Sequence, residues 1–193
     1  MAKNMNIYMS GVGGQGIGVL SEVMIQACLA AGHNVKGVDT HGLAQRGGVV
    51  VSHLRLGEKL FTPRITPGSA DIVIALERLE ALRGTVNFMK DGGTLVYYDM
   101  QMQPIHVRMN KASYPENSGV ETAVSQRKGR VERVLVEGLP DPRMQNTALL
   151  GRIAALELID GVDRETMLAA IKQVIPARAL EQNLAVFEQG SAG

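Results

Sequence analysis

The stretch Ser10-Gly-Val-Gly-Gly-Gln-Gly-Ile-Gly18 decides the fold of this chain. The run Asn6-Ile-Tyr-Met9 leads into it and a long apolar segment follows, so the pattern predicts a strand, a glycine turn and a helix. Gly11, Gly13 and Gly16 have the spacing G-x-G-x-x-G, which suits a backbone that turns tightly and approaches another group closely. The free N–H groups and the dipole of the following helix make this turn a candidate anion site.

A dinucleotide-binding Rossmann domain is one interpretation of this turn. It is favoured by Asp39, which ends a second apolar run at an offset of about 20 residues, as expected of a ribose ligand. Two features oppose it. No crossover helix follows Asp39, because the polar loop Thr40-His-Gly-Leu-Ala-Gln-Arg-Gly-Gly48 runs directly into the next apolar segment. In addition, Gln15 lies inside the turn, where its amide can face whatever the turn holds.

Composition is that of an ordinary globular protein. The 193 residues suffice for one domain, and the net charge of +1 gives no reason to propose nucleic acid or an anionic membrane as a partner. No segment has the roughly 18 uncharged apolar residues of a membrane span, and no signal peptide is recognisable, so we expect a cytoplasmic location. With Cys28 as its only cysteine, the chain alone cannot form a disulfide, a zinc thiolate site or a four-cysteine iron–sulfur cluster.

The first half of the chain predicts an α/β sheet. The helix over residues 16–31, closed by Gly32, is apolar on nearly all sides, so we expect it to be covered both by its own sheet and by a second layer. A short helix is predicted at 77–83, and residues 59–62 are expected to form a hairpin with the preceding strand. The predicted strands are 6–9, 35–38, 49–56, 71–76 and 94–99. The last two are continuous apolar runs, which are typical of buried parallel strands.

The second half predicts edge strands followed by three helices. Further strands or edge segments are expected at 105–109, 121–125 and 133–136. Asn146 is expected to cap the first C-terminal helix and Asp163 the second, and Pro176 begins a third that Gly190 ends. Asn183 falls on the apolar face of that third helix and needs a hydrogen-bond partner there. The prediction is a single Rossmann-like domain over residues 1–190, mostly parallel with an antiparallel hairpin and a helical C-terminal segment, and a tail at 191–193.

Three features with reactive or charged groups are interpreted as structural. Cys28 lies within the first apolar helix and is expected to be a small buried residue without a chemical role. His53 is placed on the polar face of its strand, because no second metal-type residue accompanies it. The basic segment Arg127-Lys-Gly-Arg130 is expected to be a solvated turn. We predict no catalytic residue and no metal ligand in the chain.

Two glycine-containing segments together resemble a known family. Gly11-Val-Gly-Gly-Gln-Gly16 and the loop His41-Gly-x-x-Gln-Arg-Gly-Gly48 are similar to segments of the gamma-type subunits of 2-oxoacid:ferredoxin oxidoreductases. The segments Asn146–Gly151 and Asn183–Gly190 also resemble that family, so the similarity spans almost the whole chain. Within the family, the form Thr40-His-Gly followed by Ala-Gln-Arg most resembles the small subunit of the indolepyruvate-type enzymes.

The resemblance implies an enzyme complex in which this chain is not autonomous. The family reaction converts a 2-oxoacid and coenzyme A to an acyl-CoA and carbon dioxide and reduces ferredoxin; the resemblance favours an aryl 2-oxoacid such as indolepyruvate. Thiamine diphosphate carries the carbanion chemistry and iron–sulfur clusters carry the electrons. The chain has neither a Gly-Asp-Gly thiamine motif nor a set of cysteines, so both cofactors are expected on a partner large subunit.

The role that the resemblance leaves to this chain is to complete the complex. It is expected to supply a polar, glycine-lined wall near the active site or the coenzyme A. Arg46 is the expected anion ligand, because its guanidinium can bind a carboxylate or a phosphate in two places. The other residues expected in the cofactor-binding wall are Gly11, Gly13, Gly14, Gln15, Gly16, Thr40, His41, Gln45 and Gly47.

Two other classes of function remain as alternatives. One is a self-sufficient NAD(P)-dependent dehydrogenase of Rossmann type. The other is a stand-alone regulator that binds coenzyme A or a nucleotide without a partner chain. The spectrum of the purified protein, its affinity for a nicotinamide and its dependence on a partner distinguish the three classes.

Overall fold

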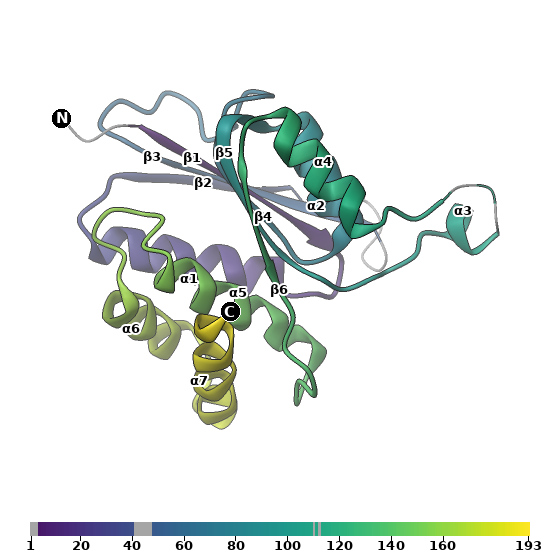
Figure 1. Ribbon diagram of the computed structural model, residues 1–193. Coiled ribbons are helices and arrows are strands. Elements are labelled where there is room, and N and C mark those ends of the chain that lie inside the picture. Colours follow the sequence, from purple (N-terminus) through teal and green to yellow (C-terminus); the bar gives the residue numbers. More distant parts are fainter. Residues whose placement is uncertain (1–3, 41–47, 110, 112) are drawn as a thin grey trace.

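The computed structural model describes residues 4–40, 48–109, 111 and 113–193, which form a sheet with helices on both faces (Figure 1). The strands are β1 (Met5–Val12), β2 (Val35–Thr40), β3 (Val49–Leu56), β4 (Ala70–Ala75), β5 (Met89–Tyr98) and β6 (Arg130–Val134). The helices are α1 (Ile17–Ala30), α2 (Arg78–Asn87), α3 (Ile105–Arg108), α4 (Asn117–Gln126), the 3₁₀ turn η1 (Pro142–Met144), α5 (Gln145–Ala155), α6 (Arg164–Val174) and α7 (Ala177–Ala192).

The sheet is mostly parallel with an antiparallel part, as predicted. The strand order is β2-β3-β1-β4-β5-β6, and β1, β4, β5 and β6 are parallel neighbours. The strand β3 runs antiparallel to both β1 and β2. The predicted hairpin with residues 59–62 is therefore wrong: both edges of β3 are already paired, so residues 59–62 cannot join it and lie in a loop.

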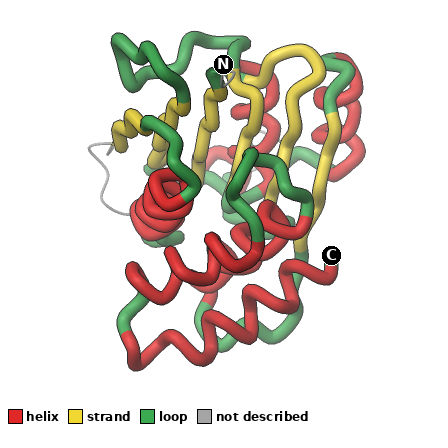
Figure 2. Tube along the Cα trace, turned by 90° about the vertical axis from the view of Figure 1, so that its left-hand side faces the viewer, coloured by secondary structure: helices red, strands yellow, loops and turns green. Residues whose placement is uncertain are grey.

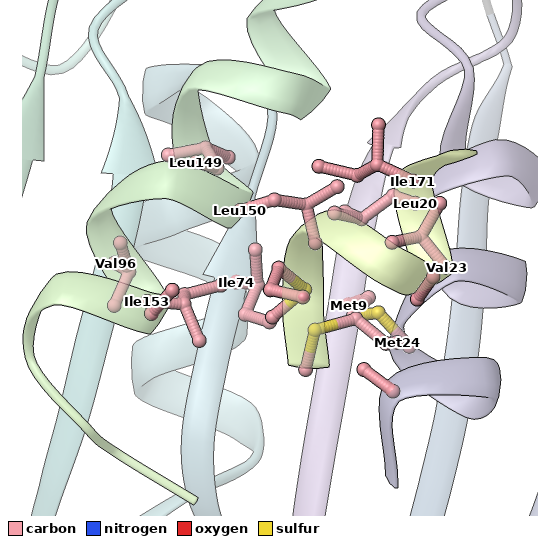
Figure 3. Close-up of a cluster of buried hydrophobic side chains, with 14 of the residues drawn as sticks. Met9, Leu20, Val23, Met24, Ile74, Val96, Leu149, Leu150, Ile153 and Ile171 are labelled. Atoms are coloured by element: carbon pink, nitrogen blue, oxygen red, sulfur yellow. The ribbon is translucent and has the colours of Figure 1, made fainter. Parts of the chain in front are cut away.

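The two faces of the sheet bury two separate clusters. The helices α1, α5, α6 and α7 cover one face, and α2 and α4 cover the other (Figure 1). Because side chains alternate along a strand, Met9 faces the first layer and Tyr8 the second. In the larger cluster, Met9, Ile74 and Val96 of the sheet gather with Leu20, Leu150 and other helical side chains (Figure 3).

The helix α1 is covered twice, as predicted from its apolar surface. One side packs on the sheet, and α6 and α5 pack against it from outside. Figure 2 shows the C-terminal helices gathered together below the strands. Gly32, with φ of 83°, ends the helix, and the N–H groups of Gly32 and His33 donate to the carbonyls of Leu29 and Cys28, both at 3.0 Å. Cys28 is fully buried, as expected, and burial raises the pKa of its thiol to about 12.

Of the three strands predicted in the middle of the chain, two are helices and the third is a strand with shifted bounds. Residues 105–108 form the helix α3, and residues 121–125 lie inside the helix α4. In α4, Val120 and Val124 are buried against α2; their spacing of four residues is the helical period, which short windows do not separate from a strand. The third strand, β6, lies at 130–134 rather than 133–136, because its register with β5 pairs Thr94 with Arg130.

The C-terminal helices confirm one predicted cap and correct two other positions. Asp163 caps α6 by accepting the N–H of Thr166 at 2.8 Å. Asn146 is not a cap: it lies inside the first turn of α5, which continues directly from η1. Gly190 does not end α7, which runs to Ala192; it is buried where α7 crosses α5, so close approach rather than termination requires the glycine.

His53 is buried rather than placed on a polar face. Its ring lies edge-on to Tyr8 at 5.3 Å and to Phe88 at 5.6 Å between centroids. Its Nδ1 accepts the N–H of Ile65 at 3.2 Å, which ties the loop after β3 to the sheet. Burial lowers the pKa of His53, so the imidazole is held in its neutral form.

Candidate functional site

The carboxyl ends of the four parallel strands meet at one edge of the sheet. The glycine turn leaves β1 there, residues 76–77 leave β4 and residues 99–100 leave β5. After the loop that follows β6, the start of α5 returns to the same edge, where Nδ2 of Asn146 lies 3.4 Å from the carbonyl oxygen of Gly16. Open α/β sheets bind ligands at this edge, so these segments form the candidate site.

The glycine turn presents a helix N-terminus that no side chain of the described residues caps. Gly14 and Gly16 have φ of 103° and 85°, a left-handed conformation that residues with a side chain rarely adopt. The first turn of α1 contains no acidic residue. At α2, by contrast, the carboxylate of Glu77 accepts the N–H groups of Leu79 at 3.0 Å and Glu80 at 2.7 Å. Of these two helix ends, that of α1 is the one suited to an external anion.

Gln15 holds the glycine turn together from within. Its side chain is buried: Oε1 accepts the N–H of Val12 at 2.7 Å, and Nε2 donates to the carbonyl of Leu76 at 3.2 Å. Nε2 also lies 3.7 Å from Sδ of Met100. A Cβ at Gly11 would approach Oε1 of Gln15 at 3.0 Å, so glycine there leaves room for this amide. The amide therefore links the segments after β1, β4 and β5, and its predicted contact with a ligand stays a prediction.

The second glycine loop is described only at its ends. Thr40 is exposed at the end of β2. His41, Gln45, Arg46 and Gly47 lie outside the described residues, and their predicted roles stay predictions. Gly48, the first described residue after them, accepts the N–H of Gly13 at 2.8 Å. This end of the loop therefore lies beside the glycine turn, although the two are far apart in sequence.

Asp39 does not have the position of a Rossmann ribose ligand. Since β3 separates β2 from β1, Asp39 lies two strand spacings, or about 10 Å, from the strand that leads into the glycine turn. Its Oδ1 accepts the hydroxyl of Ser21 on α1 at 3.1 Å, and that hydroxyl also lies 2.8 Å from Oγ of Ser52 on β3. Asp39 thus anchors the edge strand β2 to α1, which does not favour the dehydrogenase alternative.

A buried polar network at this edge was not found by the sequence analysis. The guanidinium of Arg78 pairs with Asp99 at 2.6 Å, and Asn117 donates to the other oxygen of Asp99 at 2.9 Å. The hydroxyl of Tyr114 donates to Glu77, and burial, with the charge of Glu77 as a further cause, raises the pKa of Tyr114. The network fastens the segment between β5 and α4 to the strand ends. Its sequence signature is an acidic residue directly after a buried apolar run, which both Glu77 after Leu76 and Asp99 after Tyr98 satisfy.

A pocket of about 260 Å³ adjoins the glycine turn. It lies between the N-terminus of α1, the segment 141–146 and the connection from α6 to α7. Its apolar lining consists of Val19, Met144, Val174, Ile175, Pro176 and Ala179. Its polar side chains are Asp141, Arg143, Asn146, Arg178 and Asn183, of which the two asparagines are buried. The predicted need of Asn183 for a partner is confirmed: its Oδ1 accepts from Thr147 at 2.6 Å and its Nδ2 donates to the carbonyl of Ala179 at 2.8 Å.

The described residues provide neither a metal-binding cluster nor a membrane-spanning helix. Among the described residues, no three or more His, Cys, Asp or Glu side chains are grouped so that they could hold a metal ion. Of the helices in the described ranges, none is long and apolar enough to cross a membrane.

The matching family and the similar individual proteins agree with one another. Residues 6–193 match the family model described as pyruvate ferredoxin/flavodoxin oxidoreductase. The indolepyruvate oxidoreductase subunit IorB of Thermococcus kodakarensis is 30% identical over 196 aligned positions, which cover 97% of this chain and 95% of that protein.

Two solved structures share the fold. The gamma subunit of the keto/oxoacid ferredoxin oxidoreductase of Geobacter sulfurreducens has a TM-score of 0.63 at 18% identity, covering 97% of this chain and 96% of that one. The 2-oxoglutarate:ferredoxin oxidoreductase of Magnetococcus marinus, solved with 2-oxoglutarate, coenzyme A and succinyl-CoA bound, has a TM-score of 0.68 at 20% identity. In the latter comparison all of this chain is covered but only 31% of the longer chain.

Proposed function

The chain belongs to the pyruvate ferredoxin/flavodoxin oxidoreductase family as a subunit of a 2-oxoacid:ferredoxin oxidoreductase, and from this premise we propose that its complex oxidises an aryl 2-oxoacid such as indolepyruvate. The near full-length similarity to an indolepyruvate oxidoreductase subunit supports this substrate class. The reaction is oxidative decarboxylation, which yields an acyl-CoA and carbon dioxide and transfers the electrons to ferredoxin.

The role we assign to this chain is to bind an anionic group of one substrate. The observation that carries it is the uncapped N-terminus of α1, reached through the left-handed Gly14 and Gly16 at the carboxyl edge of the sheet. Such a helix end favours a carboxylate of the 2-oxoacid or a phosphate of coenzyme A. Arg46 completes the site in this proposal, because its loop ends at Gly48 beside the glycine turn.

The redox and carbanion chemistry belongs, in this proposal, to a partner large subunit. The chain has one cysteine and no Gly-Asp-Gly motif, so we place the iron–sulfur clusters and the thiamine diphosphate on the partner. Thiamine diphosphate, when bound there, supplies the stabilised carbanion that decarboxylation requires. The small subunit then positions a substrate at the shared boundary of the two chains.

Reconstitution tests the proposal directly. The isolated chain is expected to be colourless and to turn over no 2-oxoacid. Adding the thiamine- and cluster-bearing large subunit should restore coenzyme A-dependent reduction of ferredoxin, with indolepyruvate preferred in a panel of 2-oxoacids. Turnover by this chain alone would refute the division of labour, and NAD(P)-dependent turnover would favour the dehydrogenase alternative.

Substitution of Arg46 tests the anion site in the assembled complex. Arg46→Lys keeps the charge but loses the two-point geometry, so the KM of either the 2-oxoacid or coenzyme A should rise by roughly 5- to 150-fold, which corresponds to about 1–3 kcal/mol. Arg127→Lys is the matched control, since Arg127 follows α4 and lies at the opposite edge of the sheet, beside Gly92. Unchanged KM and kcat in both Arg46→Lys and Arg46→Ala would remove this loop from the site.

A further inference from the structure

Asn146 is a buried carboxamide whose hydrogen-bonding capacity the described residues satisfy only in part. It is 4% exposed and lines the pocket beside the glycine turn. Its Nδ2 has only the long 3.4 Å contact with the carbonyl of Gly16. Its Oδ1 lies 3.1 Å from the hydroxyl of Thr147, but that hydroxyl has one hydrogen and a shorter contact, 2.6 Å, with Asn183. When Thr147 donates to Asn183, Asn146 keeps its second N–H and its Oδ1 available in the same plane.

The unsatisfied pair defines the chemistry of the missing group. Buried polar groups in folded proteins are almost always hydrogen-bonded, so the remaining capacity of Asn146 calls for a partner other than the described residues. A group that offers one acceptor and one donor side by side matches it, and an amide is the simplest such group. The peptide backbone of a polypeptide presents this pair at every residue other than proline.

The rest of the pocket favours a polypeptide over a free small molecule. Its volume of about 260 Å³ can accommodate one or two side chains. Val19, 40% exposed, contributes to an apolar wall with Ile175 and Ala179. At the rim, Arg143 pairs with Asp141, whereas Arg178 makes no ion pair within the described part of the chain. The rim thus keeps one uncompensated positive charge.

From these observations we propose that this pocket is a docking site for the large subunit. A segment of that subunit inserts an apolar side chain between Val19 and Ala179, pairs its peptide group with Asn146 and places an acidic residue near Arg178. The proposal rests on the proposed function for the existence of that partner.

The test compares two alanines of α7 that differ in position. Ala179→Phe fills the pocket from its wall, and Ala185→Phe adds the same side chain to an exposed site on the same helix outside the pocket. Asn146→Asp keeps the shape of the side chain and removes its N–H donors. The affinity of each folded variant for the purified large subunit is measured by titration, with the circular dichroism spectrum and Tm of each variant as folding controls.

The expected result is a selective loss of affinity. Ala179→Phe and Asn146→Asp should each raise the Kd for the large subunit by on the order of 10-fold or more, while Ala185→Phe should match the wild type. Equal Kd values for Ala179→Phe and Ala185→Phe would overturn the proposal. The proposal would also fail if Ala179→Phe bound the large subunit with wild-type affinity but coenzyme A no longer raised the Tm of this variant. The occupant of the pocket would then be the small molecule. If neither the wild type nor Ala185→Phe binds the large subunit, the proposed function itself fails.

Discussion

Replacement of Gly190 by alanine tests the packing that holds the C-terminal helices in place. Gly190 lies in α7 where it crosses α5, and a Cβ there would come within 2.6 Å of the carbonyl carbon of Ala148 and closer still to its oxygen. Gly151 on α5 makes the reciprocal approach to the carbonyl of Phe187. The two helices therefore meet backbone to backbone, and the contact also fixes how Asn146 is placed relative to α7.

The size of the effect follows from two opposing contributions. In a helix interior, alanine is favoured over glycine by about 1 kcal/mol. Against this, real Cβ atoms essentially never approach another heavy atom within 3.0 Å, so the helices must separate by roughly 1 Å. Overpacking of a core costs about 1–3 kcal/mol, and the obstacle here is backbone, which cannot rotate away. The difference between the two contributions is a net loss of up to about 2 kcal/mol, and the backbone obstacle places Gly190→Ala at that upper end, with a Tm lower by roughly 4–8 °C in a chain of this length.

Thermal and urea denaturation of the purified protein measure this loss. Gly119→Ala is the matched control, because Gly119 is also helical and exposed and an added Cβ meets nothing within 4 Å. That substitution should raise stability by up to about 1 kcal/mol. A Tm of Gly190→Ala equal to or above that of Gly119→Ala would refute the close contact between α5 and α7.

Three further predictions concern buried groups. Because burial lowers the pKa of His53, the unfolded state takes up the proton first as the pH falls below about 6.5, and the free energy of unfolding declines from there down to the pKa of the folded state. His53→Gln keeps an acceptor for the N–H of Ile65 and should lose less stability over this pH range. Identical pH profiles of the two proteins would contradict this. Cys28, whose pKa is raised to about 12, should resist iodoacetamide at pH 8 until the protein unfolds, and rapid labelling of the native protein would contradict its burial. The variant Cys28→Ala should retain the activity of the complex. Asp99→Asn leaves the guanidinium of Arg78 buried without its counter-charge and should lower the free energy of unfolding, measured in urea, by about 3–5 kcal/mol. A loss below about 1 kcal/mol would show that the fold does not depend on this ion pair.

The sequence alone predicted the features whose physical cause is local. The turn from β1 to α1 requires glycines at particular backbone angles, and Gly32 and Asp163 act through bonds to residues within a few positions. The continuous apolar runs of β4 and β5 likewise follow from burial on both faces. Each of these patterns is complete within a short window, so it can be interpreted without knowledge of the rest of the chain.

The candidate site could be located from the sequence but not assembled from it. The glycine turn was identified correctly, and Gly48 does lie beside it. The polar network of Glu77, Arg78 and Asp99 was missed, because its members are joined only when β4 and β5 become neighbours. His41 to Gly47 lie outside the described residues, so the predicted role of Arg46 depends on the experiment above.

Only the tertiary structure decided the features in which two distant segments meet. The insertion of β3 between β1 and β2 ruled out a hairpin at 59–62 and placed Asp39 away from the position of a Rossmann ribose ligand. The crossing of α5 and α7 converted Gly190 from an apparent helix end into a point of contact. Likewise, Asn146 became the polar wall of a pocket instead of a cap. The physical reason is the same in each case: strand pairing and close helix packing depend on the partner that arrives from elsewhere in the chain, and the local sequence does not contain that partner.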